Sequence, residues 1–108
     1  MTEEFSDFDI ASLLRSKDAI EDFLNDAFEE ENAAYIAHAL GIAARAKGMT
    51  KVAKETNLTR EALYRSFSED GNPSLKSTIA VLKALGFRLV VQRHAAETGG
   101  AEKPQAAE

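Results

Sequence analysis

A twenty-residue stretch near the middle of the chain, Met49 to Ser68 (MTKVAKETNLTREALYRSFS), has the pattern of a helix-turn-helix. Val52 and Ala53 supply the apolar face of a short first helix, and the small Ala53 side chain lets a second helix cross closely. Asn57 stands at the turn, where the chain often needs a left-handed residue, and asparagine accepts that conformation better than most residues. The stretch therefore predicts two short helices that cross at a tight turn.

The second of these helices has a clear inner and outer face. Leu58 is expected to fill the corner, Thr59 to cap the helix, and Ala62 and Leu63 to face inward. The residues left outward are Thr59, Arg60, Glu61, Tyr64, Arg65 and Ser68. Such a set suits a recognition helix, whose first side chains reach base edges in DNA. A plain helical hairpin is the alternative, because two short helices joined by a tight turn occur in many proteins that never contact DNA. Two positions depart from the usual pattern, since Asn57 stands where glycine is commoner and Ser66 where an apolar residue is typical. We expect Phe67 to take over the packing role of an apolar residue at position 66.

The net charge of -5 hides a segregation of charge along the chain. Residues 1–32 carry eleven acidic and two basic side chains, whereas residues 33–96 carry ten basic and four acidic ones. The part with the helix-turn-helix pattern is therefore basic, as contact with phosphates requires. The acidic first third suits a partner with a basic surface, unless its charge is only that of a solvated helical face.

Apolar residues at helical spacing and capping residues predict further helices on both sides of this pattern. The expected helices cover residues 8–14, 17–30, 33–47, 50–56, 59–67 and 75–85. Ser16, Asn32 and Ser74 are expected as N-caps, and Gly48 and Gly86 are expected to end the helices before them. In the last helix the expected apolar stripe consists of Leu75, Ile79, Leu82 and Leu85. The sequence thus predicts an all-α domain of five or six helices.

Residues 87–92 (FRLVVQ) have high β propensity and predict a short strand. Because a lone strand leaves its backbone groups without partners, we expect it to pair with a second copy of the chain or with another protein. The alternative is an extended tail whose apolar side chains pack against the core. The expected organisation is an acidic helical segment at 1–32 packed on the domain, a helix-turn-helix core at 33–86, the strand at 87–92 and a disordered tail at 93–108.

Enzymatic and metal-binding functions find no support in the sequence. The chain has no cysteine, no Gly-rich phosphate loop and only two histidines, His38 and His94. We therefore expect no catalytic residue, cofactor or metal site, and we expect His38 to be a packed or surface side chain of a helix. With neither a signal peptide nor an apolar stretch long enough to span a membrane, the chain is expected to be a soluble cytoplasmic protein.

Several short stretches of the chain share the pattern of one known family. They are Ala39-Leu40-Gly41, Ala46 to Thr50 (AKGMT), Thr59 to Arg65 (TREALYR), Gly71-Asn72-Pro73 and Leu85-Gly86, with Phe8-Asp9 and Ile20 to Ala27 nearer the N-terminus. Through them the chain resembles the addiction-module antidote family over about residues 8–92. These are HigA-like antitoxins with a helix-turn-helix of the phage-repressor (Xre) type.

The resemblance implies a homodimeric, five-helix, repressor-like domain that binds operator DNA in its own promoter and silences a small basic toxin of the RelE/HigB-like class. The residues expected to contact DNA are Thr50, Lys51, Lys54, Thr59, Arg60, Glu61, Tyr64 and Arg65. Phe87, Leu89 and Val91 are expected to mediate dimerisation. Two alternatives stay open, namely a standalone phage-type repressor without a toxin, and an interaction module that sequesters a toxin without binding DNA.

Overall fold

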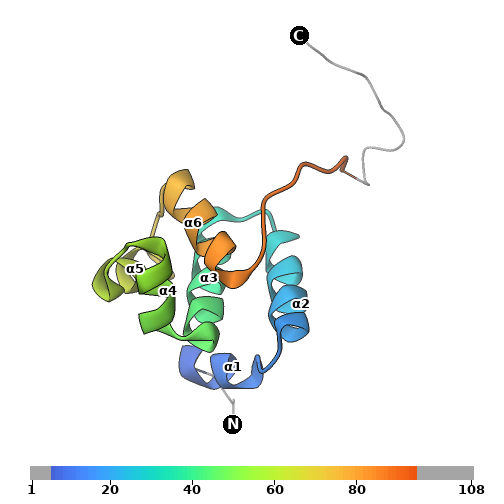
Figure 1. Ribbon diagram of the computed structural model, residues 1–108. Helices are drawn as coiled ribbons and strands as arrows, with labels where there is room; N and C mark the ends of the chain where they lie inside the picture. Colours follow the sequence, from blue (N-terminus) through green and yellow to red (C-terminus); the bar gives the residue numbers. More distant parts are fainter. Residues whose placement is uncertain (1–5, 95–108) are drawn as a thin grey trace.

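Six helices account for the regular structure of residues 6–94, the part of the chain that this computed structural model describes (Figure 1). They are α1 (Asp7–Leu13), α2 (Lys17–Phe28), α3 (Ala33–Lys47), α4 (Met49–Thr56), α5 (Arg60–Ser66) and α6 (Leu75–Leu85). Every helix boundary lies within two residues of the one that the sequence predicts. The expectation of an all-α domain with five or six helices is confirmed for these residues.

The helix ends are fixed by local interactions that the sequence already indicates. The Asn32 side chain accepts a hydrogen bond from the Tyr35 backbone N–H at 2.9 Å, and the expected caps Ser16 and Ser74 act in the same way. Each cap satisfies one of the backbone donors that a helix leaves without a partner in its first turn. At the other ends Gly48 and Gly86 take positive φ angles of 119° and 93°, which glycine adopts without steric cost.

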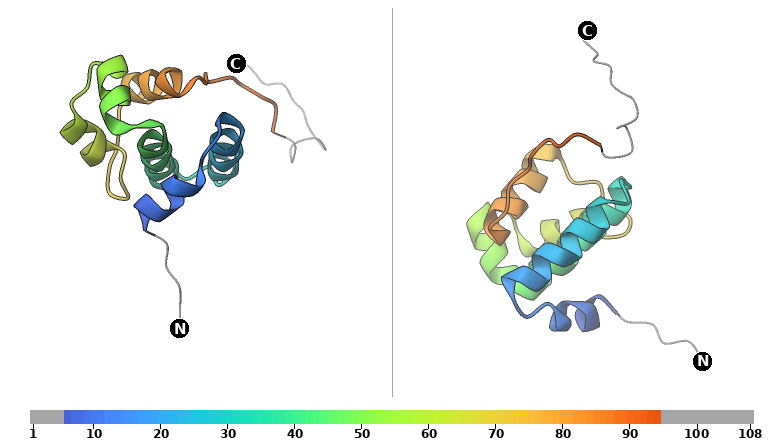
Figure 2. Two further views of the ribbon diagram at one scale, coloured as in Figure 1. Left: turned by 60° about the horizontal axis from the view of Figure 1, so that its bottom comes forward. Right: turned by 90° about the vertical axis from the view of Figure 1, so that its right-hand side faces the viewer.

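Helix α3 forms the centre of the domain (Figures 1 and 2). Helix α2 lies along one side of it, α4, α5 and α6 lie on the other side, and α1 crosses one end. The largest fully buried side chains come from four different helices and are Leu40, Val52, Leu63 and Val81. Ile20, Leu24 and Ala27 of α2 belong to the same core. The packing of the other helices on α3 therefore fixes the orientation of the helix-turn-helix within the domain.

The expected apolar stripe of α6 is wrong at its first two positions. Leu75 and Ile79 are 67% and 40% exposed, whereas Leu82 and Leu85 are buried as expected. Val81, which the stripe omits, is completely buried. Helix α6 carries apolar residues on more than one face, so spacing alone does not decide which face packs against α3 and α4.

The strand expected at residues 87–92 is also absent from the described part of the single chain, where residues 87–94 form no regular secondary structure. A strand needs a partner, and none of the described residues supplies one. Phe87 instead packs against the core, with the Lys17 ammonium 5.9 Å from its ring centre. The extended-tail alternative therefore holds for Phe87, whereas Leu89 and Val91 are exposed.

The remaining expectations about the chain ends fall partly outside the described residues. Residues 93 and 94 are described, but the rest of the expected disordered tail, 95–108, is not, and neither are residues 1–5 of the expected acidic segment. Among the helices between residues 6 and 94, none has the length and apolar character needed to cross a membrane.

Candidate nucleic-acid interface

The turn between α4 and α5 is held by hydrogen bonds as well as by its backbone conformation. Asn57 adopts the left-handed conformation, with φ 63° and ψ 27°, as the sequence predicts. The Thr56 hydroxyl donates a hydrogen bond to the Val52 carbonyl oxygen at 2.7 Å. The Leu58 N–H donates to the Ala53 carbonyl oxygen at 3.2 Å and lies 3.3 Å from the Thr56 hydroxyl. These contacts fix the direction in which α5 leaves α4.

Helix α5 is anchored at both ends. Its N-cap, Thr59, accepts a hydrogen bond from the Ala62 N–H at 2.9 Å. Leu63 in the middle of the helix and Phe67 directly after its last residue are almost fully buried, so Phe67 supplies the packing expected of it. The end of α5 also lies directly on Gly41 of α3, where an added Cβ would collide with the Phe67 carbonyl oxygen. The outer face of α5 is thereby turned to solvent.

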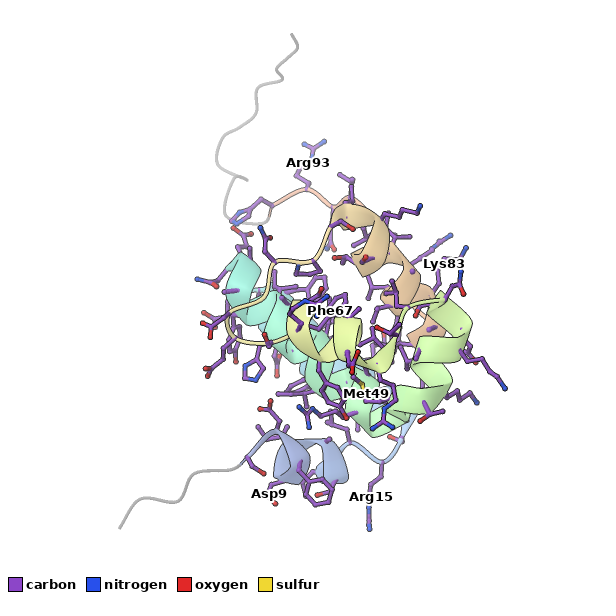
Figure 3. The ribbon with its side chains drawn as sticks, turned by 90° about the vertical axis from the view of Figure 1, so that its left-hand side faces the viewer. Asp9, Arg15, Met49, Phe67, Lys83 and Arg93 are labelled. Carbon is purple, nitrogen blue, oxygen red and sulfur yellow. The ribbon has the colours of Figure 1, made fainter. Side chains whose placement is uncertain are left out.

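All eight residues expected to contact DNA are exposed and belong to α4, to α5 or to the N-cap of α5. These two helices lie on the same side of the domain and face the viewer in Figure 3. Lys51, Lys54 and Arg65 thus add positive charge to this side. Ser68 departs from the expected outward set, because it is half-buried and its hydroxyl donates to the Arg65 carbonyl oxygen at 3.0 Å.

A hollow of about 360 Å³ separates the helix-turn-helix from α1. Thr50, Arg60 and Tyr64, three of the expected DNA contacts, line it together with Phe8 and Ser12 of α1. The structure therefore brings these three residues together beside the N-terminal helix.

Arg45 of α3 lines the same hollow, and sequence reasoning missed it as a site residue. Its guanidinium carbon lies 4.8 Å from the centre of the Tyr64 ring, and the guanidinium carbon of Arg60 lies 5.9 Å from the same centre. Both distances are typical of cation–π contacts. In the sequence Arg45 only indicates a basic last turn of α3, because neither spacing nor motif connects it to α5.

Asp7, the first residue of α1, connects that helix to α3. Its carboxylate oxygens lie 2.9 and 3.0 Å from the His38 Nε2 atom, and Oδ2 lies 4.0 Å from Nη2 of Arg45. His38 is thus a packed side chain with a structural partner, as the sequence predicts. The contact places a carboxylate beside a cation of the candidate interface.

The far side of the domain has the opposite charge. The acidic residues of α2 and of the turn after it are all exposed and are Asp18, Glu21, Asp22, Asp26, Glu29, Glu30 and Glu31. Figure 1 places α2 at the right of α3, whereas α4 and α5 lie at its left. Between residues 6 and 94 no group of three histidine or carboxylate side chains is arranged to hold a metal ion.

The fold and this surface together define a small helical domain that exposes a basic helix-turn-helix. Residues 4–93 match the family described as "Probable addiction module antidote protein", and the chain belongs to that family. The family predicted from the sequence motifs is thereby confirmed. A similar protein from Haemophilus influenzae (strain ATCC 51907 / DSM 11121 / KW20 / Rd), described as uncharacterized, is 40% identical over 93 residues, which cover 86% of this chain and 96% of that protein. No solved structure gives a significant match.

Proposed function

We propose that this protein is a DNA-binding antitoxin that neutralises a small basic toxin of the RelE/HigB-like class and represses the operon encoding both. The observation that carries the proposal is the anchored helix α5, whose exposed face bears Arg60, Tyr64 and Arg65. It lies in a chain of an antidote family, and an antidote implies a toxin as its partner.

Recognition of DNA would begin with α5 entering the major groove of the operator. Arg60 and Arg65 are proposed to contact guanine edges or phosphates, because a guanidinium offers two parallel donors to either. Thr59 and Glu61 stand at the start of the helix and are proposed to reach base edges, and Tyr64 to reach a thymine methyl group or a phosphate. The exposed residues of α4, which are Thr50, Lys51 and Lys54, would hold the DNA backbone.

The acidic surface of α2 is the proposed contact for the toxin. Its carboxylates are exposed and complement a basic partner in charge. Because α2 lies across α3 from α4 and α5, a toxin bound there leaves the DNA-facing helices accessible (Figure 1). This arrangement supports a protein that represses its operon while it holds the toxin.

Dimerisation is proposed to involve Phe87, Leu89 and Val91. Leu89 is 45% exposed and Val91 is fully exposed in the single chain, so both side chains are available to a second copy. Phe87 already packs against the core and would fix the start of the segment. Since operon DNA and toxin are both in the cytoplasm, we place the protein there.

The proposal is tested by titrating the protein against the DNA upstream of its own gene at two salt concentrations, with a scrambled duplex as control. We expect sequence-dependent binding that weakens as salt rises, because bound cations displace the counterions of the phosphates. Equal affinity for the two duplexes would rule out the DNA reader and leave an interaction module that only sequesters a toxin.

The toxin is tested separately by co-expressing the neighbouring reading frame with the chain. We expect a small basic protein to purify with the chain and to lose its effect on growth. Operator binding without such a partner would instead identify a standalone phage-type repressor.

A further inference from the structure

A continuous set of side-chain contacts runs from the first residue of α1 to the candidate reading helix. Asp7 contacts His38 at 2.9 Å and Arg45 at 4.0 Å. The Arg45 guanidinium lies on the Tyr64 ring, and the Arg60 guanidinium lies near that same ring. Three segments that are distant in sequence thus meet at the edge of the DNA-facing side, and Figure 3 shows α1 directly below the helix-turn-helix.

We propose that Asp7 and Arg45 are positioning residues for DNA reading, through which α1 sets the orientation of Tyr64 and Arg60. The inference rests on the proposed DNA-binding function and adds to it two residues outside α4 and α5. Neither residue needs to contact a base, because each acts through the side chain next to it.

Arg45 is suited to this role because its backbone is rigid. Ala43 and Ala44, the two residues before it, are completely or almost completely buried in the core. The Arg45 side chain is 34% exposed, and its planar guanidinium packs against a ring that α5 carries. A planar cation on an aromatic face restricts the orientation of both groups. Arg45 therefore transmits the fixed position of α3 to the Tyr64 side chain.

Asp7 is needed because Arg45 and Arg60 bring two positive charges to one ring. Like charges at such distances repel each other, and a carboxylate beside one of them offsets the repulsion. Without the Asp7 carboxylate, the repulsion between the two guanidinium groups moves the more exposed one, that of Arg60, away from the Tyr64 ring. The position of an expected base-reading residue would then be lost although the residue itself is present.

The position of α1 in turn depends on its contacts with α3. Helix α1 has only seven residues, and Ala11 is its single buried residue among those described. A helix of this length is not stable in isolation. The paired contact of Asp7 with His38 and Arg45 is therefore a main link between α1 and the rest of the domain.

The experiment separates an effect on position from an effect on charge. Asp7→Asn removes a negative charge near the DNA, which raises affinity for any duplex to a similar extent. If Tyr64 and Arg60 lose their orientation, the ratio of operator affinity to scrambled-duplex affinity falls instead. We expect Asp7→Asn to lower this ratio by about threefold to tenfold. We expect a similar fall for Arg45→Lys, which keeps the charge but not the planar group.

The matched control is Asp70→Asn, which removes the same charge from the exposed turn after α5. We expect its affinity ratio to equal that of the unmodified protein. Circular dichroism checks that all variants are folded, and the NMR shifts of the Tyr64 ring protons check the contact without DNA. These shifts should change in Asp7→Asn and Arg45→Lys and stay constant in Asp70→Asn.

Two results would overturn the inference, and they differ from each other. If the unmodified protein prefers the operator and both positioning variants keep its affinity ratio, Asp7 and Arg45 have no role in reading, and the proposed function stands. If the unmodified protein shows no preference, the proposed function fails and the inference fails with it.

Discussion

Gly41 has no side chain, and this allows α3 to lie directly against the end of α5. An alanine normally stabilises a helix relative to glycine by about 0.5–1 kcal/mol. Here the added methyl group would collide with the backbone carbonyl of Phe67, which ends α5. We expect Gly41→Ala to lower the free energy of unfolding by about 1–3 kcal/mol, as overpacking does, in urea denaturation.

The control for this substitution is the reverse change at an exposed position of the same helix. Ala34→Gly lies in the first turn of α3 and should lower the free energy of unfolding by less than the roughly 0.5–1 kcal/mol that glycine costs in the middle of a helix. An unchanged or higher stability of Gly41→Ala would mean that the end of α5 moves away from α3 without cost.

Arg60 is the residue whose loss should most directly affect the choice of DNA sequence. We expect Arg60→Ala to weaken operator binding by about 1–3 kcal/mol and to reduce the preference over a scrambled duplex. Arg93→Ala removes the same charge outside the helix-turn-helix and should affect both duplexes alike. If Arg60→Ala and Arg65→Ala both leave operator affinity unchanged in fluorescence anisotropy titrations, α5 is not the reading helix.

At the scale of the elements, α6 provides a comparison within one helix. Leu82 is 4% exposed in the core, whereas Leu75 is 67% exposed. We expect Leu82→Ala to lower the free energy of unfolding by about 2–5 kcal/mol, because it removes buried methyl groups and leaves a cavity. Leu75→Ala should cost less than about 0.5 kcal/mol, as is usual at the surface. If thermal unfolding shows that Leu75→Ala and Leu82→Ala lose equal stability, Leu75 lies in a buried contact, such as one between two copies of the chain.

The helices were predictable because their ends depend on neighbouring residues. Asn32, Asn57 and Thr59 act on backbone groups within a few residues, so their roles follow from a short stretch of sequence. The packing face of α6 was not predictable in this way. Leu75 and Val81 are both apolar, and only the positions of α3 and α4 decide that Val81 is buried.

The residues of the candidate site also differ in whether they could be predicted from a short stretch of sequence. The exposed residues of α5 follow from the phase of a single helix, which Leu63 sets by facing the core. Arg45 joins the site because α3 packs against α5, and Asp7 joins it because α1 folds back on α3. The periodicity of the sequence does not indicate contacts between residues so far apart along the chain.

At the scale of the whole molecule, the exposed Leu89 and Val91 predict a dimer. In a strand that forms by pairing across the dimer, alternate residues lie on one face, so Leu89 and Val91 would pack together on the same side. We expect the double substitution Leu89→Asp with Val91→Asp to convert the dimer to a monomer in sedimentation experiments. Val90→Asp adds a charge on the other face and is the control.

The operator sequence should have the same two-fold symmetry as the expected dimer. A dimer requires two half-sites about 34 Å apart, or a multiple of that spacing. A chain that stays monomeric at high concentration and beside its operator would contradict the two-fold arrangement.

The opposite charges of α2 and of the α4–α5 side give the domain a permanent electric dipole moment (Figure 1). In the field of a DNA duplex a dipole turns before contact is made, so that α4 and α5 approach the phosphates first. Encounters then start in a productive orientation more often than random diffusion allows. Added salt shortens the range of this torque, and the association rate constant should therefore fall as the salt concentration rises.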